Sequence, residues 1–178
     1  ANCAVDSGWV KQPYFAVTVP QDFGYQKYFR QEGIVQKVLR DSSLAGLDAE
    51  ATHKALYEVY RYRGLLTADG SWDPKVFKDD NAQNLSKNYA FAHVQLSQEY
   101  KRKGDFPKAI AEMERVVRMF PTWVEIQLPL GGIYLATGDS TKAWAFYDDL
   151  VKRAPQSADA HYYLGASLGY REQVTGAI

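Results

Sequence analysis

Two stretches in the second half of the chain repeat each other: residues 96–109 read LSQEYKRKGDFPKA, and residues 130–143 read LGGIYLATGDSTKA. Seven identical pairs recur at a spacing of 34 residues: Leu96/Leu130, Tyr100/Tyr134, Gly104/Gly138, Asp105/Asp139, Lys108/Lys142, Ala109/Ala143 and Pro121/Pro155. A third copy opens with Leu164-Gly165, again 34 residues after Leu130-Gly131. Self-similarity at a fixed period of this length predicts a stack of helical hairpins.

Each matched position has a physical role in such a hairpin. The Gly-Asp pairs at 104–105 and 138–139 suit a left-handed residue that ends one helix and an N-cap acceptor that begins the next. Small residues at Ser97, Gly131 and Gly165 let two helix backbones approach closely, and the prolines end the second helices. The second helices are amphipathic, with apolar residues every three or four positions: Ile110, Met113, Val117 and Phe120, then Ala143, Tyr147, Leu150 and Ala154.

The pattern L-S-x-x-Y…G-D…K-A…P and its copy resemble the tetratricopeptide (TPR) repeat family. The resemblance implies a concave groove that binds extended peptides or partner helices, and no chemistry in the repeat itself. We therefore expect a mostly α fold, a TPR-type α-solenoid of about 2.5 repeats, preceded by a small N-terminal segment of one β-strand and two helices. The expected boundaries are residues 1–80 for that segment and 81–178 for the repeats, at about 90–123, 124–157 and 158–178, the last one partial.

The first helices of a TPR array line its groove, and the register of the repeat predicts which residues face it. These are Phe91, Val94, Gln98 and Lys101, then Glu125, Leu128, Gly132 and Leu135, then Asp159, Tyr162 and Ala166. TPR domains that grip a terminal carboxylate carry lysine and asparagine at the fifth and ninth positions, where this chain has Val94 with Gln98 and Leu128 with Gly132. An apolar or aromatic polypeptide segment is the better-fitting ligand. The alternative is that these residues only cover the surface of a spacer.

Pro129 breaks the pattern inside the first helix of the second repeat. It lacks an amide donor, leaves the Glu125 carbonyl without its helical partner, and costs about 3 kcal/mol in an ordinary helix interior. We expect a helix that is kinked or begins late at this point.

Lysine plus arginine and aspartate plus glutamate both total 21, so the formal charge is zero. This balance argues against nucleic acid or an anionic membrane surface as the main partner. The one dense basic cluster, Lys101–Lys103, lies where a helix ends and cations suit its dipole. The single cysteine, Cys3, excludes an intrachain disulfide and a thiolate metal site.

The N-terminal half carries weaker signals. Residues 14–19, YFAVTV, predict a strand, and no second strand of equal quality follows, so this strand must pair with something absent from this sequence, pair with another copy of the chain, or lie extended against the repeats. Helices are expected over Gln26–Arg40, with Gly33 as a weak point or a close contact, and over Asp48–Tyr62, capped by Asp48 and packed on the first repeat. Residues 67–80 predict a loop joining the two parts, pinned by Trp72 and Phe77.

Four short segments of this half are similar to the soluble tail of a bacterial membrane family. They are Pro13–Val19, Tyr28–Gly33, Tyr60–Leu65 and Asn88–Ala90. Members of that family have a many-helix, glycosyltransferase-C-like (protein O-mannosyltransferase-like) membrane part and an extracytoplasmic region that often carries TPRs. The resemblance implies that this chain is a fragment, and that the unpaired strand belongs with a missing upstream part. The catalytic residues of the family are expected upstream, so none is assigned to this chain.

No motif in the sequence indicates catalysis, a metal or a cofactor. There is no P-loop, GxGxxG or nucleophile elbow. His93 and His161 occupy one repeat position two repeats apart, too far to share an ion. The adjacent carboxylates Asp79-Asp80 and Asp148-Asp149 diverge on a helix, which favours a solvated surface.

The leading hypothesis is a non-catalytic scaffold on the periplasmic face of a bacterial membrane, soluble as isolated and tied to the membrane only through the missing upstream region. A part that binds a glycan or acceptor for the parent enzyme, and a free-standing cytoplasmic adaptor, are the alternatives.

Overall fold

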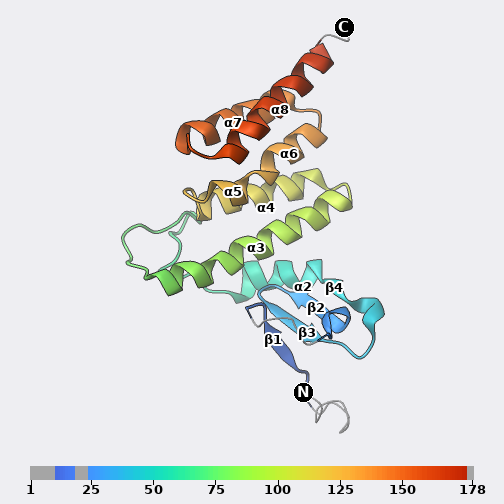
Figure 1. The fold of residues 1–178 in the computed structure, drawn as a ribbon. Coiled ribbons are helices and arrows are strands. Elements are labelled where there is room, and N and C mark those ends of the chain that lie inside the picture. Colours follow the sequence, from blue (N-terminus) through green and yellow to red (C-terminus); the bar gives the residue numbers. More distant parts are fainter. Residues whose placement is uncertain (1–10, 19–23, 176–178) are drawn as a thin grey trace. The chain divides into compact units, whose positions relative to one another are not determined.

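The computed structural model describes residues 11–18 and 24–175 (Figure 1). The chain forms two compact units, one of Ala1–Arg61 with Asp79–Leu96 and the other of Tyr62–Lys78 with Ser97–Ile178. Helix α3, Asp80–Arg102, contributes to both. The expectations made for Cys3, and for the strand at its last residue Val19, fall outside the described residues.

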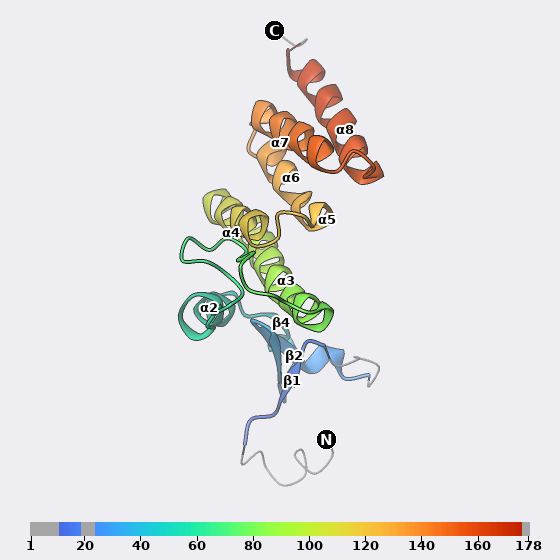
Figure 2. The ribbon, with the colours of Figure 1, turned by 90° about the vertical axis from the view of Figure 1, so that its left-hand side faces the viewer.

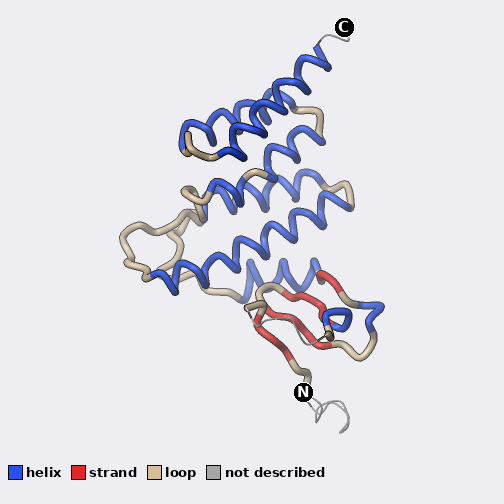
Figure 3. The backbone as a smooth tube through the Cα atoms, viewed as in Figure 1, coloured by secondary structure: helices blue, strands red, loops and turns tan. Residues whose placement is uncertain are grey.

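The first unit contains a four-stranded sheet of order β1-β3-β2-β4 (Figure 3). Its strands are β1 (Tyr14–Ala16), β2 (Phe29–Glu32), β3 (Val35–Val38) and β4 (Gly46–Leu47), and short 3-10 turns lie at Gln26–Tyr28 and Ser42–Leu44. Strands β1 and β2 pair antiparallel with β3, and β4 runs parallel to β2. Phe15 on β1 packs on Phe29 on β2, with ring centroids 5.7 Å apart.

Two expectations for this half are wrong. Residues 26–40 form a β-hairpin and not a helix, because Gly33 has a φ of 69° and makes a two-residue turn with Ile34 between Glu32 and Val35. Apolar residues at 29, 35 and 38 also fit a helical period, but they are aromatic or β-branched and pack well on a sheet. The first strand is not unpaired either, since it pairs with β3 from Tyr14–Lys37 to Ala16–Val35.

The second expected helix is confirmed in its start and its cap, but it ends at Val59 and not at Tyr62, because the backbone is extended at Tyr60. It comprises α2 (Ala49–Lys54) and a π-helical turn (Ala55–Val59), and the Asp48 carboxylate accepts the Ala51 amide at 3.0 Å. This segment also closes the hairpin. The Gly33 amide donates to Thr52 Oγ1 and the Ile34 amide to the Tyr60 hydroxyl, each at 3.0 Å. A side chain at Gly33 would begin 2.4 Å from that hydroxyl, so the expected close contact is real.

The second unit holds the repeated helices. They are the end of α3, then α4 (Phe106–Met119), α5 (Val124–Gln127), α6 (Pro129–Ala136), α7 (Ser140–Arg153) and α8 (Ala158–Thr175). Helix α6 packs on α4 and α7, and α8 packs on α7 and α5 (Figures 1 and 2). Helical repeats are therefore present, and their stacking into a solenoid stays a prediction.

The two helix reversals of this unit are near-copies at the atomic level. Gly104 and Gly138 have φ angles of 79° and 82°, and the next amides, of Asp105 and Asp139, both donate 2.9 Å bonds to the carbonyls of Tyr100 and Tyr134. The two aspartates then accept the amides of Lys108 and Lys142 as N-caps. The predictions for these pairs are confirmed.

The helix of the second repeat is interrupted as Pro129 predicts. Helix α5 ends at Gln127 and α6 begins at Pro129, so the expected interruption is confirmed. The buried Gln127 holds the preceding connection, because its amide donates to the Phe120 carbonyl at 2.7 Å and its oxygen accepts from Arg153 at 3.0 Å.

The small residues at equivalent positions meet different surroundings. Ser97 is buried and donates to the Ala109 carbonyl at 2.7 Å, while Gly131 lies against the Tyr147 ring. Gly165 has no described atom within 4 Å of where a side chain would begin, so the close contact expected there is wrong.

Among the described residues, no helix combines the length and the apolar composition that crossing a bilayer requires.

Gly131→Ala tests the close approach of α6 to α7. A methyl group there would begin 2.3 Å from the Tyr147 ring, and we expect the free energy of unfolding to fall by roughly 1–3 kcal/mol. Gly132→Ala is the matched control, since its side chain would meet nothing within 4 Å and should stabilise the helix by about 0.5–1 kcal/mol. Urea unfolding of both variants measures the difference, and equal effects would contradict the close contact.

Candidate functional site

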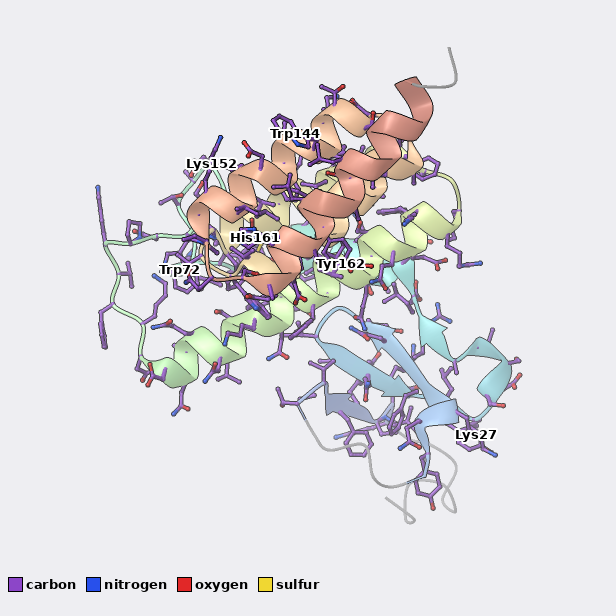
Figure 4. The ribbon with its side chains drawn as sticks, turned by 45° about the horizontal axis from the view of Figure 1, so that its top comes forward. Lys27, Trp72, Trp144, Lys152, His161 and Tyr162 are labelled. Carbon is purple, nitrogen blue, oxygen red and sulfur yellow. The ribbon has the colours of Figure 1, made fainter. Side chains whose placement is uncertain are left out.

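Among the repeat side chains whose burial the structure describes, Tyr162 on α8 is the most exposed aromatic one, at 71%. It meets Tyr163 edge to face at a centroid distance of 5.4 Å. Tyr163 in turn stacks on Tyr147 of α7 at 5.6 Å, with the rings inclined by 17°. In Figure 4, Tyr162 and Trp144 lie on opposite sides of the pair formed by α7 and α8. A row of rings therefore runs from the core to the surface.

Tyr147 anchors this row. Its side chain is 1% exposed, its hydroxyl donates to the Leu128 carbonyl at 3.2 Å, and its other ring neighbour is Phe146 at 5.9 Å. Burial, and to a lesser extent the nearby Tyr163, raise the pKa of Tyr147 to about 12. The outer tyrosines are thus fixed to a rigid support, which reduces the conformational entropy that a ligand must remove on binding.

The structure exposes most of the predicted groove residues of this unit. Gln98, Lys101, Glu125, Asp159, Tyr162 and Ala166 are exposed, and Gly132 and Leu135 are half-buried. Their assignment to a ligand surface stays a prediction.

Leu128 differs from its repeat equivalent Tyr162. Leu128 is 9% exposed and belongs to a core cluster with Val124, Tyr147 and Ala160, so α7 and α8 cover it. The equivalent surface around Tyr162 carries no such cover among the described residues. Leu128 therefore contributes to the core, and it offers a ligand much less area than Tyr162 does.

Phe91 and Val94 lie in the other unit, on the first part of α3. Phe91 is 48% exposed and Val94 is 8% exposed. In that unit the Tyr57 ring of the capping helix meets His93 of α3 edge to face at 5.8 Å, which supports the expected packing of that helix on the start of the first repeat.

Residues 101–168 match the tetratricopeptide repeat family model. The match supports TPR repeats over the helical hairpins of the second unit, and a TPR repeat suggests a role in protein interaction. Helical repeats of this kind generally carry no catalytic chemistry. No curated protein matches the chain.

The basic cluster at the end of α3 is exposed and partly paired. Glu99 accepts two bonds from Arg102, at 2.7 and 2.8 Å, and pairs with Lys103 at 3.2 Å. These cations hold the pKa of the Glu99 carboxyl at about 2. The cluster therefore forms a solvated helix end, as its position predicted.

The polar groups that suggest metal chemistry have local structural partners. His93 is buried beside the Tyr57 ring, and a His161 ring nitrogen lies 2.8 Å from the Pro155 carbonyl. Asp148 and Asp149 pair with Lys152 and Arg153 one turn later. In the part of the chain that the structure describes, no three His, Cys, Asp or Glu side chains come together as ligands.

Sequence reasoning missed Tyr163. The register selected Tyr162 alone, although Tyr163 supports it. The available signal was a spacing of 16 residues, which separates Gly131 from Tyr147 and Tyr147 from Tyr163. This spacing places the three residues on three successive helices, α6, α7 and α8.

Leu128→Ala and Tyr162→Ala should separate a core role from a surface role. We expect Leu128→Ala to lower the free energy of unfolding by roughly 2–5 kcal/mol through the cavity it leaves. Tyr162→Ala should change it by less than about 0.5 kcal/mol, because its ring faces solvent. Urea denaturation measures both, and a large loss for Tyr162→Ala would show that the described exposure is wrong.

Alkaline unfolding tests the burial of Tyr147. A folded-state pKa near 12 against an ordinary value of 10 stabilises the fold below pH 10, and this contribution is lost as the pH rises toward 12. This difference in pKa corresponds to a contribution of roughly 3 kcal/mol to the free energy of unfolding. Tyr147→Phe, compared with the wild type by urea unfolding from pH 8 to 12, should lose less stability over that range. Parallel curves would contradict the assignment.

Proposed function

We propose that the TPR repeats bind an extended polypeptide through their first helices, with Tyr162 as an aromatic anchor. The observation that carries the proposal is an exposed ring held by Tyr163 on the buried Tyr147. Rigid tyrosines with an apolar body and a polar tip are enriched among the residues that dominate binding energy.

The predicted groove residues around this anchor favour a ligand of mixed character. Glu125 and Asp159 supply carboxylates at equivalent positions, Gln98 and Lys101 supply donors, and Leu135 adds apolar surface. A segment with an aromatic or aliphatic side chain flanked by polar or basic residues matches this set. The absence of lysine and asparagine at the fifth and ninth repeat positions disfavours a ligand that binds through its terminal carboxylate.

The proposal extends to the context of the chain. We place it in the extracytoplasmic, periplasmic tail of a bacterial membrane protein of the glycosyltransferase-C-like kind, where it recruits or positions a polypeptide. The support is the resemblance of four N-terminal segments. The pairing of β1 with β3 removes one argument for that context, since the strand does not need an upstream partner. Many apolar spans of about 20 residues in the upstream coding region would support this context, and their absence would favour a free cytoplasmic adaptor.

Tyr162 also favours a second candidate, binding of a glycan for the parent enzyme. Exposed tyrosine rings offer flat apolar faces with a hydroxyl at the edge, a surface on which sugar rings can stack. The two candidates share the residue and differ in the ligand.

Selection of peptides from a random display library on the full 178-residue chain tests the proposal. We expect enrichment of peptides with an aromatic or aliphatic centre, and Tyr162→Ser should weaken their binding about tenfold or more, the effect of losing an anchor. Tyr25→Ser is the matched control, because Tyr25 is 51% exposed in the other unit and should leave binding unchanged.

Three outcomes would contradict peptide binding at this site. They are no enrichment, equal weakening by both variants, and enrichment that is indifferent to Tyr162→Ser. Saturable binding of a glycan panel that Tyr162→Ser abolishes, without peptide enrichment, would establish the second candidate in its place.

A further inference from the structure

Residues 62–78, which precede α3 in the sequence, form an ordered segment that is hydrogen-bonded to α4. The Leu65 and Leu66 amides both donate to the Tyr62 carbonyl at 3.0 Å, and Leu66 bridges to Trp72 as in a small hairpin. Gly64 and Gly70 have φ angles of 74° and 81°, which the turns require.

Trp72 attaches this hairpin to the end of α4. Its amide donates to the Arg118 carbonyl at 3.1 Å, and its ring lies 5.6 Å from Phe120. Trp72 therefore pins the segment as expected, whereas Phe77 is 90% exposed and does not. These backbone bonds fix the course of the main chain in this segment.

A pocket of about 360 Å³ lies between this hairpin and α4, wholly within the second unit. Its lining comprises Tyr62, Arg63, Leu66, Thr67, Ala68, Asp69, Gly70 and Arg115. Nothing in the repeat pattern indicates it, because all but one of these residues precede the first repeat.

Two arginines line the pocket. Arg115 of α4 is half-buried, with its guanidinium carbon 6.0 Å from the centroid of the Tyr62 ring and Nη1 3.9 Å from where a side chain would begin at Gly70. The glycine thus leaves room for the guanidinium against the turn. Arg63 is exposed, and no carboxylate within the described residues pairs with it.

The one carboxylate of the lining, Asp69, serves the turn itself. It accepts the hydroxyl of Thr67, and the hydroxyl and amide of Ser71 at 3.0 and 3.4 Å. These bonds hold the pKa of Asp69 below its ordinary value, so it is ionised at neutral pH. The formal charges of these lining residues, two arginines and one aspartate, sum to +1.

This charge and this shape select a ligand class. A single positive charge balances one carboxylate, whereas a phosphate near −2 would stay uncompensated. A guanidinium binds a carboxylate through two parallel bonds. The volume exceeds that of a bare ion, and the Tyr62 ring and Leu66 provide apolar surface for methylene groups.

We infer that this pocket binds the side-chain carboxylate of a glutamate in a partner polypeptide, through Arg63 and Arg115, with its methylenes against Tyr62 and Leu66. The site is separate from Tyr162 and does not depend on the function proposed for that residue.

Titration of the ¹⁵N-labelled full chain with N-acetyl-glutamate α-amide tests the inference. This probe carries the side-chain carboxylate as its only charge. We expect saturable amide shifts at Gly64, Gly70 and Ser71, and about tenfold or greater weakening in Arg63→Gln, the loss expected for a bond to a charged group. Arg118→Gln is the matched control. It removes the same charge from an exposed arginine one turn along α4, outside the lining, and should leave the affinity unchanged.

Three further arms decide the chemistry. N-acetyl-glutamine amide is the neutral equivalent and should produce no saturable shift at these positions. Inorganic phosphate should bind more weakly than the carboxylate probe, and Tyr162→Ser should bind the probe as the wild type does. Equal binding of the glutamine compound, tighter binding of phosphate, equal weakening by Arg118→Gln, or the absence of saturable shifts would overturn the inference.

Discussion

The second unit depends on one contact, the Tyr147 ring in the space that Gly131 leaves open. A side chain at position 131 would begin 2.3 Å from that ring, so only glycine lets α6 approach α7 this closely. The Tyr147 hydroxyl reaches the Leu128 carbonyl at the interruption that Pro129 causes. The same ring supports Tyr163, and through it Tyr162. A packing contact in the core thus determines where an aromatic side chain is presented to solvent.

The sequence was sufficient for features that depend on a few neighbouring residues. The Gly-Asp reversals, their N-caps and the interruption at Pro129 follow from backbone conformation and missing donors, which act within one turn of helix. Exposure could not be read in this way. Leu128 and Tyr162 occupy the same repeat position, yet one is 9% and the other 71% exposed, because α8 covers the first. The register of the repeat predicts on which face of a helix a residue lies. Whether that face is buried depends on the element that packs against it.

The N-terminal sheet shows the opposite failure, in which a local pattern was compatible with two structures. Residues 26–40 place apolar side chains at helical spacing, and their division into two short strands depends on Gly33 and on groups distant in sequence. Thr52 and Tyr60 accept the two amides of the turn, and β1 pairs along β3. The requirement that the first strand find a partner was correct, but the partner lay in a segment assigned to a helix. One wrong assignment therefore produced the other.

Charge on the second unit is mostly neutralised within single turns, and this decides which charged groups can act on a ligand. Asp105 with Lys108, Asp139 with Lys142, and Asp148 with Lys152 pair at 2.9, 3.1 and 2.6 Å along their own helices. Such exposed pairs add little to stability, but they leave little net field at the helix surfaces. Asp69 is also bound within its own turn, but its partners are hydroxyl and amide donors, which leave its negative charge uncancelled. Arg63 has no such pairing within its own turn. The other charged residues that line its pocket are a second arginine, Arg115, and Asp69. In a chain whose formal charge is zero, specificity for an anion must arise from such a local imbalance, and the hairpin on α4 holds one in a fixed geometry.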